Sequence, residues 1–414
     1  MNEYFKQEDS LYDICNKYPE TISVFVGNGF EQMKDIDKRE TFGKTISLST
    51  ALSLKNINID TFKALLIEKI ELENNVADLG VKLVNKNSDK DIIKIEGLLP
   101  CPVRIPLLEK MNDFIKQSKN SMDFEIEYNL KAASMGLDWL KELVSNEDEP
   151  QKLPAIFISA GFDLFFDDKL MGKFKEKDVF TDGTGLTKLN SDFDNKYISL
   201  KDPKAHYSII GVVPAVFLVN ISELKGREIP KTWEDILKPE FEKSVSLPIG
   251  DFDLFNAILL NIEKLYGEEA IKKLGKSLIA SMHPSEMVKS DRKTINRPTV
   301  TIMPYFFTKM IKPGGIMKAV WPEDGAIISP IFMLTKKDKM VQIKPIIDFF
   351  ASIEVGEILA HKGLFPSTIP GVDNKLSKDN LFQWLGWDYI YNNNIGEKIG
   401  HSNKIFNSSI KKGV

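Results

Sequence analysis

The residues that could carry out chemistry in this chain are few and scattered. Four histidines and two cysteines are spread over 414 residues, and none of them stands at a spacing typical of a metal site. The sequence contains no glycine-rich phosphate loop, no dinucleotide fingerprint, no His-Glu-x-x-His motif and no Gly-x-Ser-x-Gly motif. These absences favour a protein that binds a ligand without transforming it, and we expect no cofactor.

A catalytic alternative stays open at this point. Cys101 could serve as a nucleophile if Asp163 or His283 lay beside it in a cleft, because an adjacent acid or imidazole can activate a thiol. An enzyme on this scaffold would need such a pair.

The candidate ligand-binding residues follow from the elements that must position them. Residues 91–97, 124–128 and 155–159 are predicted strands, each followed by a predicted helix, and this alternation predicts a parallel sheet. Ligands bind where the carboxyl ends of such strands meet helix N-termini. The residues selected there are Cys101, Arg104, Met135, Ser159, Ala160, Gly161, Phe162, Gly250, Asp251, Phe252, His283, Ser285, Tyr305 and Trp321.

Each candidate also has a plain structural interpretation. Ser159-Ala160-Gly161 could let the backbone approach an anionic or carbonyl group, or it could be an ordinary strand-to-helix turn. Arg104 could clamp a carboxylate or phosphate with its planar guanidinium, or it could face solvent or pair with an acid. The aromatic side chains could wall an apolar pocket or belong to the core; they are Phe162, Phe252, Tyr305, Phe306 and Trp321.

Two long apolar runs are predicted to connect two halves of the protein. Residues 211–220 and 326–334 are apolar at almost every position, which is typical of strands covered on both faces. After the first run, Thr232 stands three residues before Asp235, a spacing that predicts a capped short helix. We expect paired crossings between two sheet-bearing lobes, with a ligand held between the lobes.

The run 211–220 and the passage Ile229-Pro-Lys-Thr-Trp-Glu-Asp-Ile-Leu-Lys-Pro-Glu-Phe241 resemble the extracytoplasmic solute-binding proteins of ABC transporters. The similar family is the two-lobed, type II periplasmic-binding-protein class with iron, polyamine and thiamine binders, and the resemblance spans roughly residues 91–390. It implies an α/β fold whose first lobe comprises residues 91–220 plus about 326–414, and whose second lobe comprises residues 221–325. It also implies closure over a small ligand by hinge motion and an ABC permease as partner, although an intracellular sensor or carrier is an alternative.

The resemblance raises the question of iron, for which relatives commonly supply adjacent tyrosines. Residues 303–307 read Met-Pro-Tyr-Phe-Phe and offer only Tyr305, whereas ferric iron prefers several hard anionic oxygen ligands. His283 is the one histidine in a predicted cleft loop, and a lone histidine is usually structural. We therefore expect an organic anion or a chelated metal in preference to bare iron.

Residues 1–75 are predicted to form a separate all-α unit, joined to the rest by a polar linker at 76–90. Leu11-Tyr-Asp-Ile, Tyr18-Pro-Glu, Gly29-Phe30 and Thr45-Ile-Ser-Leu resemble a small helical domain family of unknown function. Many members carry a cysteine pair after the Gly-Phe, which is missing here, so we expect Cys15 to be a core residue. The unit could dock the binding domain to a protein partner.

The net charge and the N-terminal sequence indicate which partners and which cellular compartment to expect. A net charge of −4 gives no general attraction to nucleic acid or to an anionic membrane, and no apolar run approaches the roughly 18 residues that span a bilayer. We expect no nucleic-acid partner and no membrane insertion. The first ten residues do not read as an export signal, so we expect a cytoplasmic protein, or an extracytoplasmic one if a signal has been removed.

Overall fold

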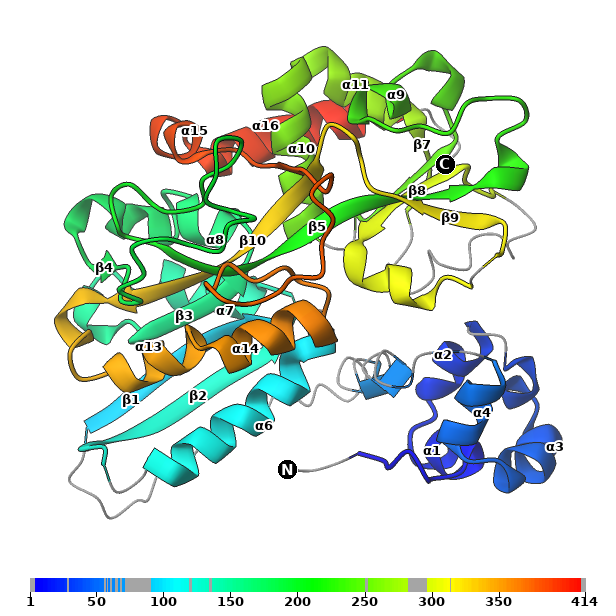
Figure 1. Ribbon diagram of the computed structural model, residues 1–414, viewed down its shortest axis with the longest axis horizontal. Helices are drawn as coiled ribbons and strands as arrows, with labels where there is room; N and C mark the ends of the chain where they lie inside the picture. The colour runs from blue at the N-terminus through cyan, green and yellow to red at the C-terminus, as the bar shows by residue number, and fades with distance from the viewer. Residues whose placement is uncertain are drawn as a thin grey trace.

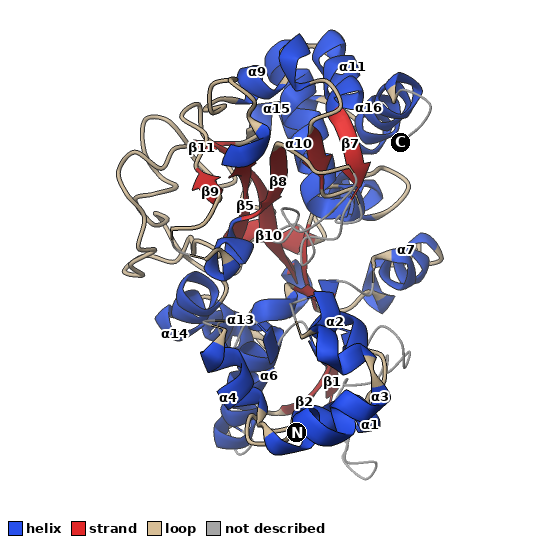
Figure 2. Ribbon diagram, turned by 90° about the vertical axis from the view of Figure 1, so that its right-hand side faces the viewer, coloured by secondary structure: helices blue, strands red, loops and turns tan. Residues whose placement is uncertain are grey.

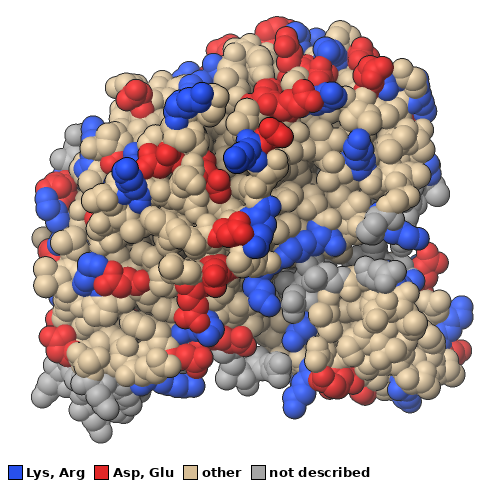
Figure 3. All heavy atoms as spheres, in the orientation of Figure 1, with Lys and Arg blue, Asp and Glu red and all other residues tan. Residues whose placement is uncertain are grey.

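The computed structural model describes residues 4–27, 30–55, 91–118, 121–133, 136–249, 252–281, 296–312 and 314–410, with residues 57, 59, 62–63, 66–67 and 69–70. These residues form a small helical unit and a larger α/β body (Figure 1). None of the described helices combines the length and the apolar character needed to cross a membrane. Lys and Arg are interspersed with Asp and Glu over most of the face in Figure 3, as expected from a net charge of −4.

The helical unit contains short helices around a core of its own. They are α1 (Leu11–Lys17), α2 (Thr21–Gly27), α3 (Ile36–Lys38) and α4 (Leu48–Leu54). The hydroxyls of Ser10 and Ser47 cap α1 and α4 by accepting a hydrogen bond from the N–H three residues later. Cys15 is buried in this core, as expected, and burial raises the pKa of its thiol to about 11.

The first sheet of the α/β body is parallel, as the sequence predicted. Strands β1 (Asp91–Leu99), β2 (Phe124–Ala132) and β3 (Ile156–Ala160) run in one direction, with β1 between the other two. Each is followed by a helix: α6 (Cys101–Ser118), α7 (Asp138–Ser145) and α8 (Asp163–Phe166). The rings of Phe114 in α6 and Phe349 in α13 (Lys344–Phe350) stack 5.0 Å apart, so α13 lies beside α6.

The second sheet repeats this arrangement with shorter strands. Strands β6 (Val245–Leu247), β7 (Leu278–Ser281) and β8 (Val300–Pro304) are parallel, with β6 between the other two. The helices α10 (Phe252–Tyr266) and α11 (Glu268–Ser277) connect β6 to β7. The strand β9 (Met317–Val320) pairs with the end of the long strand described next.

Two long strands run through both lobes, as expected from the apolar runs (Figures 1 and 2). They are β5 (Ser208–Asn220) and β10 (Ala326–Lys336), and every residue of both is buried. They pair antiparallel with each other, while β3 and β8 flank them on opposite sides, giving the order β2-β1-β3-β10-β5-β8-β6-β7. The two sheets are therefore continuous through this pair, and the lobes share two strands instead of being joined by loose links.

The short helix after the first crossing forms where it was predicted. Helix α9 (Trp233–Ile236) begins with a capping box in which Thr232 and Asp235 each accept a hydrogen bond from the other's backbone N–H. The indole of Trp233 is fully buried and donates to the carbonyl of Gly325, just before β10. The capped helix thus fixes the start of the second lobe against the return crossing.

The C-terminal helix packs on a different lobe from the one to which we assigned it. We placed residues up to 414 in the first lobe, but α16 (Ile395–Ser409) lies against α10 and α11 of the second. The rings of Phe406 and Phe255 lie 5.1 Å apart, and Lys398 forms a 3.0 Å ion pair with Glu263. The apolar side of α16 packs mainly on these helices, which explains its position. Further elements of the described residues include α14 (Ile353–Glu357) and α15 (Trp387–Asn392). The two-residue strands β4 (Phe180–Thr181) and β11 (Phe382–Gln383) pair with β10.

Candidate functional site

The ends of the two parallel strand sets face each other over the crossing strands. The last residue of β3, Ala160, pairs with Ile331 of β10, which in turn pairs with Gly211 of β5. The last residue of β8, Pro304, pairs with Ala215 of β5. Because β3 runs parallel to β5 and β8 antiparallel to it, both carboxyl ends point toward the stretch between residues 211 and 215, about 13 Å long at 3.3 Å per residue. The loops selected from the sequence therefore open toward one another.

The turn after β3 contacts α10 of the second lobe beside this stretch. Gly161, the residue after β3, has a φ of +105°, and the carboxylate of Asp253 in the first turn of α10 lies directly against it. A Cβ at position 161 would lie 2.2 Å from Asp253 Oδ1, closer than real atoms approach, so only glycine fits here unless the carboxylate moves. The turn that we considered for an anion thus faces a carboxylate of the opposite lobe.

A lysine of the first lobe lies at the same contact. The Nζ of Lys141 in α7 forms a 2.7 Å ion pair with Asp163 Oδ2; the Asp163 side chain is 13% exposed and that of Lys141 34%. Burial by itself would lower the pKa of the Lys141 ammonium, but attraction from Asp163, and further from Asp138 and Asp253, raises it. Lys141 therefore remains charged and attracts carboxylates from both lobes. The sequence did not single it out, because a lysine inside a helix looks like any solvent-facing lysine.

Arg104 is held against the neighbouring strand end. Its side chain is 4% exposed, and its Nε donates a 2.8 Å hydrogen bond to the carbonyl of Leu130, two residues before β2 ends. The alternative that the Arg104 side chain faces solvent is therefore wrong. That its guanidinium also contacts a ligand stays a prediction.

Tyr305 and Trp321, both selected from the second lobe, meet in the structure. Their ring centroids lie 5.1 Å apart in an edge-to-face arrangement, and Tyr305 directly follows the end of β8. The indole of Trp321 donates a 2.7 Å hydrogen bond to the carbonyl of Leu381 and packs edge-on against Phe382. Burial raises the pKa of the Tyr305 phenol, so this side chain is a neutral hydroxyl that can donate a hydrogen bond.

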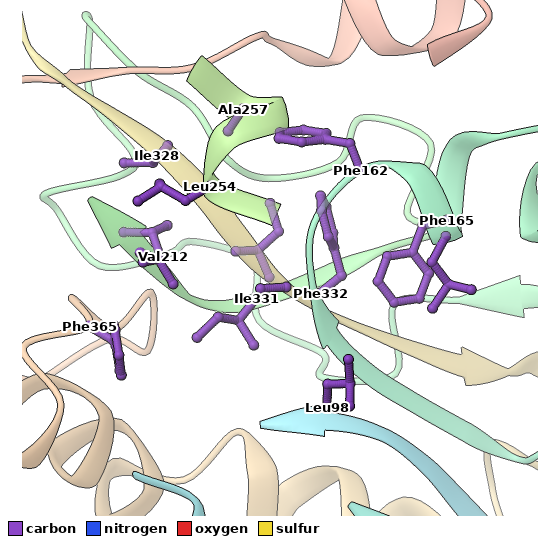
Figure 4. Packing of buried hydrophobic residues seen from close by; sticks show 14 of the residues in the cluster. Leu98, Phe162, Phe165, Val212, Leu254, Ala257, Ile328, Ile331, Phe332 and Phe365 are labelled. Carbon is purple, nitrogen blue, oxygen red and sulfur yellow. The ribbon is translucent and has the colours of Figure 1, made fainter. Parts of the chain in front are cut away.

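Phe162 takes the second of the two roles considered for it, because it belongs to the core. It is fully buried, and its ring packs against Phe332 of β10 and Trp384. Figure 4 shows Phe162 beside Ala257 of α10, with Leu254 of the same helix near Val212 and Ile328 of the crossing strands. Phe162 is therefore enclosed by aromatic rings of β10 and the C-terminal region, with α10 of the second lobe beside it.

The small residues of the same turn are also enclosed. Ser159 is fully buried, its hydroxyl donating to the carbonyl of Ala160, and Ala160 is 7% exposed. In this arrangement of the lobes neither side chain lines an open surface. Their backbone lies at the strand end as expected, and contact with a ligand stays a prediction.

Several predicted site residues cannot be placed in this way. Met135, Gly250, Asp251, His283 and Ser285 lie outside the described residues. Cys101 and Phe252 are the first residues of α6 and α10, at strand-to-helix turns as the sequence predicted, and the environment of their side chains is not described. Within the described ranges, no group of three or more His, Cys, Asp or Glu side chains could hold a metal ion.

Comparison with known proteins gives two family matches. A family model described as bacterial extracellular solute-binding protein matches residues 151–393. A second model, described as a domain of unknown function (DUF1858), matches residues 6–63, within the helical unit. No curated protein matches the chain.

Solved structures share the fold of the α/β body at low sequence identity. The apo ferric ion-binding protein A of Pasteurella haemolytica has a TM-score of 0.55 at 11% identity, over 78% of this chain and 100% of that one. An ABC transporter structure from Clostridium perfringens has a TM-score of 0.51 at 17% identity, over 77% and 100%. A Trichodesmium protein in complex with iron and citrate ligands has a TM-score of 0.52 at 10% identity, over 77% and 99%. Each of these likenesses shows a common fold, that of periplasmic binding proteins.

Proposed function

Because the chain belongs to the family of bacterial extracellular solute-binding proteins, we propose that its lobes close over a small ligand without transforming it. The observation that carries this proposal is the position of the strand ends: β3 and β8 end opposite each other over the same short stretch of β5. In open α/β sheets, ligands bind outside the carboxyl ends of the strands. Here two such ends from different lobes converge, so a ligand between them can contact both lobes.

The ligand we propose is an organic anion or a chelated metal in preference to bare ferric iron. Tyr305 supports this choice, because burial raises the pKa of its phenol and so disfavours the phenolate that would bind ferric iron directly. A neutral phenol can instead donate a hydrogen bond to a carboxylate. Arg104, held at the end of the first-lobe sheet, would supply positive charge. The iron and citrate ligands named for the Trichodesmium structure make ferric citrate a suitable first probe.

Delivery to an ABC permease is the proposed role, with an intracellular sensor or carrier as the alternative. The compartment in which the protein works decides between uptake and an intracellular role. In either case, the helical unit is a candidate for contacting a protein partner. Fractionation of native cells followed by immunoblotting distinguishes them. Recovery outside the cytoplasmic membrane supports uptake, whereas recovery only in the cytoplasm supports sensing or carriage.

The binding proposal is tested by native mass spectrometry followed by calorimetry. Protein purified without denaturation is examined for a co-purified ligand, and then titrated with citrate, ferric citrate, ferric chloride and a panel of metabolites. Tyr305→Phe and Trp321→Ala are expected to weaken binding of the active compound at least several-fold. Tyr389→Phe is the matched control, since this tyrosine of α15 is also half-buried with a pKa raised by burial.

Two results would overturn the proposal. One is a protein that carries no co-purified ligand and binds no compound of the panel. The other is binding that the cleft variants and the Tyr389→Phe control affect equally.

The catalytic alternative gains no support from the described contacts. Asp163, one of the two partners considered for Cys101, forms an ion pair with Lys141. His283, the other, lies outside the described residues. Replacing Cys101 by Ser is expected to leave ligand binding intact, and loss of a detected turnover in that variant would reopen the enzymatic interpretation.

A further inference from the structure

A cavity open to solvent lies at the end of the first-lobe sheet that is remote from the proposed ligand cleft. It has a volume of about 440 Å³ and is lined by residues 150–151, 177–179 and 336–338. Lys336 ends β10, and the residue before it pairs with Ile156, the first residue of β3. The cleft instead begins where β3 ends, at Ala160, about 13 Å further along that strand. The cavity is therefore separate from the site already proposed.

The cavity contains a lysine that is almost completely buried. The side chain of Lys336 is 4% exposed. Among the described residues, its Nζ donates one direct hydrogen bond, to the carbonyl of Gln151 at 3.2 Å. The nearby carboxylate oxygen of Asp338 lies 3.7 Å away, beyond hydrogen-bond distance. An ammonium has three N–H donors, and taking its charge out of water is costly unless close partners compensate. These contacts compensate Lys336 only in part.

The lining carries an excess of positive charge. Three lysines and two aspartates line the cavity, which leaves one positive charge. Lys337 is ion-paired with Asp178, and Asp338 is the carboxylate near Lys336. Lys177 lies over the ring of Phe174 at 5.3 Å and has no ion pair among the described residues. Lys177 is thus the cation that no carboxylate of the lining neutralises.

We propose that this cavity binds a small oxyanion, either a phosphate or a carboxylate group, with the Lys336 ammonium as its anchor and Lys177 as a second cation. An oxyanion would accept hydrogen bonds from the remaining Lys336 donors and would neutralise the excess charge. A cavity of about 440 Å³ also has room for a small organic molecule attached to the anionic group. The chemistry is the same for inorganic phosphate and for an organic acid, so the experiment must include both.

The test is calorimetric titration of the full chain with inorganic phosphate and, separately, with acetate and citrate, at constant ionic strength. We expect saturable binding of at least one of these anions. Lys336→Met should weaken it at least tenfold and Lys177→Gln several-fold. Lys344→Met is the matched control, because it removes one positive charge from an exposed residue that is paired with Asp348 outside the cavity.

The variants also distinguish anion binding in this cavity from ligand binding in the cleft. Tyr305→Phe should leave binding at this cavity unchanged, so a failure here does not affect the cleft proposal. If Lys336→Met fails to fold, Lys177→Gln, an exposed position, still tests the site. The proposal is overturned if no anion binds above the level expected from ionic strength, or if Lys177→Gln and Lys336→Met bind like Lys344→Met.

Discussion

Glu96 is a half-buried acid on the first sheet. It lies on β1 opposite Asn129 of β2, and its Oε2 is buried with no hydrogen-bond partner among the described residues. Burial, reinforced by the neighbouring Glu127, outweighs a hydrogen bond from Asn129 and raises the pKa of Glu96 to about 7. The folded protein therefore holds a proton that the unfolded chain would release at lower pH.

The sign of the resulting pH dependence follows from linkage. Because the folded-state pKa lies above the ordinary glutamate value of 4.5, the stability that this proton contributes is complete below about pH 4.5 and is lost as the pH rises through about 7. Glu96→Gln removes the charge, and we expect it to raise the free energy of unfolding by about 1–3 kcal/mol at pH 8, with little change at pH 5. Urea denaturation at both pH values measures this. The exposed Glu142→Gln is the control, and equal effects of Glu96→Gln at pH 5 and pH 8 would contradict the assignment.

Gly161 is the second position where a single residue decides the structure. Its φ of +105° is unfavourable for any side chain, and its Cα is covered by the Asp253 carboxylate. We expect Gly161→Ala to cost about 1–3 kcal/mol from backbone strain and also to separate the lobes, because a Cβ cannot occupy the same space as that carboxylate. Small-angle scattering, which reports the radius of gyration, is the measurement for the separation.

Gly226 provides a matched control for this prediction. Its φ is +87°, but nothing lies within 4 Å of the position that a Cβ would take. Gly226→Ala should therefore lower stability without changing the radius of gyration. If the two variants scatter alike, the contact between Gly161 and Asp253 does not hold the lobes together.

At the scale of elements, α9 depends on its capping box. The Thr232 hydroxyl accepts a hydrogen bond from Asp235 N–H, and the Asp235 carboxylate accepts one from Thr232 N–H at 3.0 Å. Removal of an N-cap hydroxyl typically costs about 1 kcal/mol. We expect Thr232→Ala to lose about that much in chemical denaturation, while Thr232→Ser retains most of it. A Thr232→Ser variant as unstable as Thr232→Ala would show that the methyl group, not the cap, matters.

The same capping box predicts an acid-dependent loss of stability. Burial would raise the pKa of Asp235, but the Lys238 ammonium and the N–H groups of Lys231 and Thr232 outweigh it and lower the pKa to about 2. The stability that these contacts supply is therefore present above about pH 4 and is lost as the pH falls toward about 2. Asp235→Asn should show a shallower decline over this range than the unchanged protein. Identical acid profiles would refute the role given to Asp235.

At the scale of the whole molecule, α16 spans the two lobes. Most of it packs on α10 and α11, while Gly396 in its first turn lies so close to Asp167, just after α8, that a Cβ there would be 2.4 Å from that carboxyl carbon. A helix in contact with both lobes on one side of the crossing strands restricts motion there. We infer that any opening of the lobes occurs mainly on the opposite side.

The packing of α16 can be tested by truncating its buried anchor. Phe406 is fully buried against Phe255, and removal of a buried phenylalanine ring typically costs about 3–5 kcal/mol. We expect Phe406→Ala to lose about that much stability in urea denaturation. Phe42→Ala, at a position 41% exposed in the helical unit, should change stability by about 0.5 kcal/mol or less. Similar losses from the two variants would contradict the position of α16.

Local patterns determined much of this protein from sequence alone. Four features could be predicted because each depends on residues close together in the sequence. They are the buried strands at 211–220 and 326–334, the strand-to-helix alternation of the first lobe, the cap at Thr232 and the burial of Cys15. The positions of Tyr305 and Trp321 near the strand ends could be predicted for the same reason. Their direct contact could not.

Only the tertiary structure decided which distant segments meet. Lys141 is attracted to Asp253 of the other lobe, Phe162 packs in the core against Phe332, and α16 packs mainly on α10 and α11. In each case the partners are more than a hundred positions apart in the sequence. The apolar stripe of α16 shows that it must pack against something, without showing against what. An apolar or charged side chain shows that it needs a partner, but its residue type does not specify which distant residue that partner is. The partners are brought together only when the two sheets join through β5 and β10.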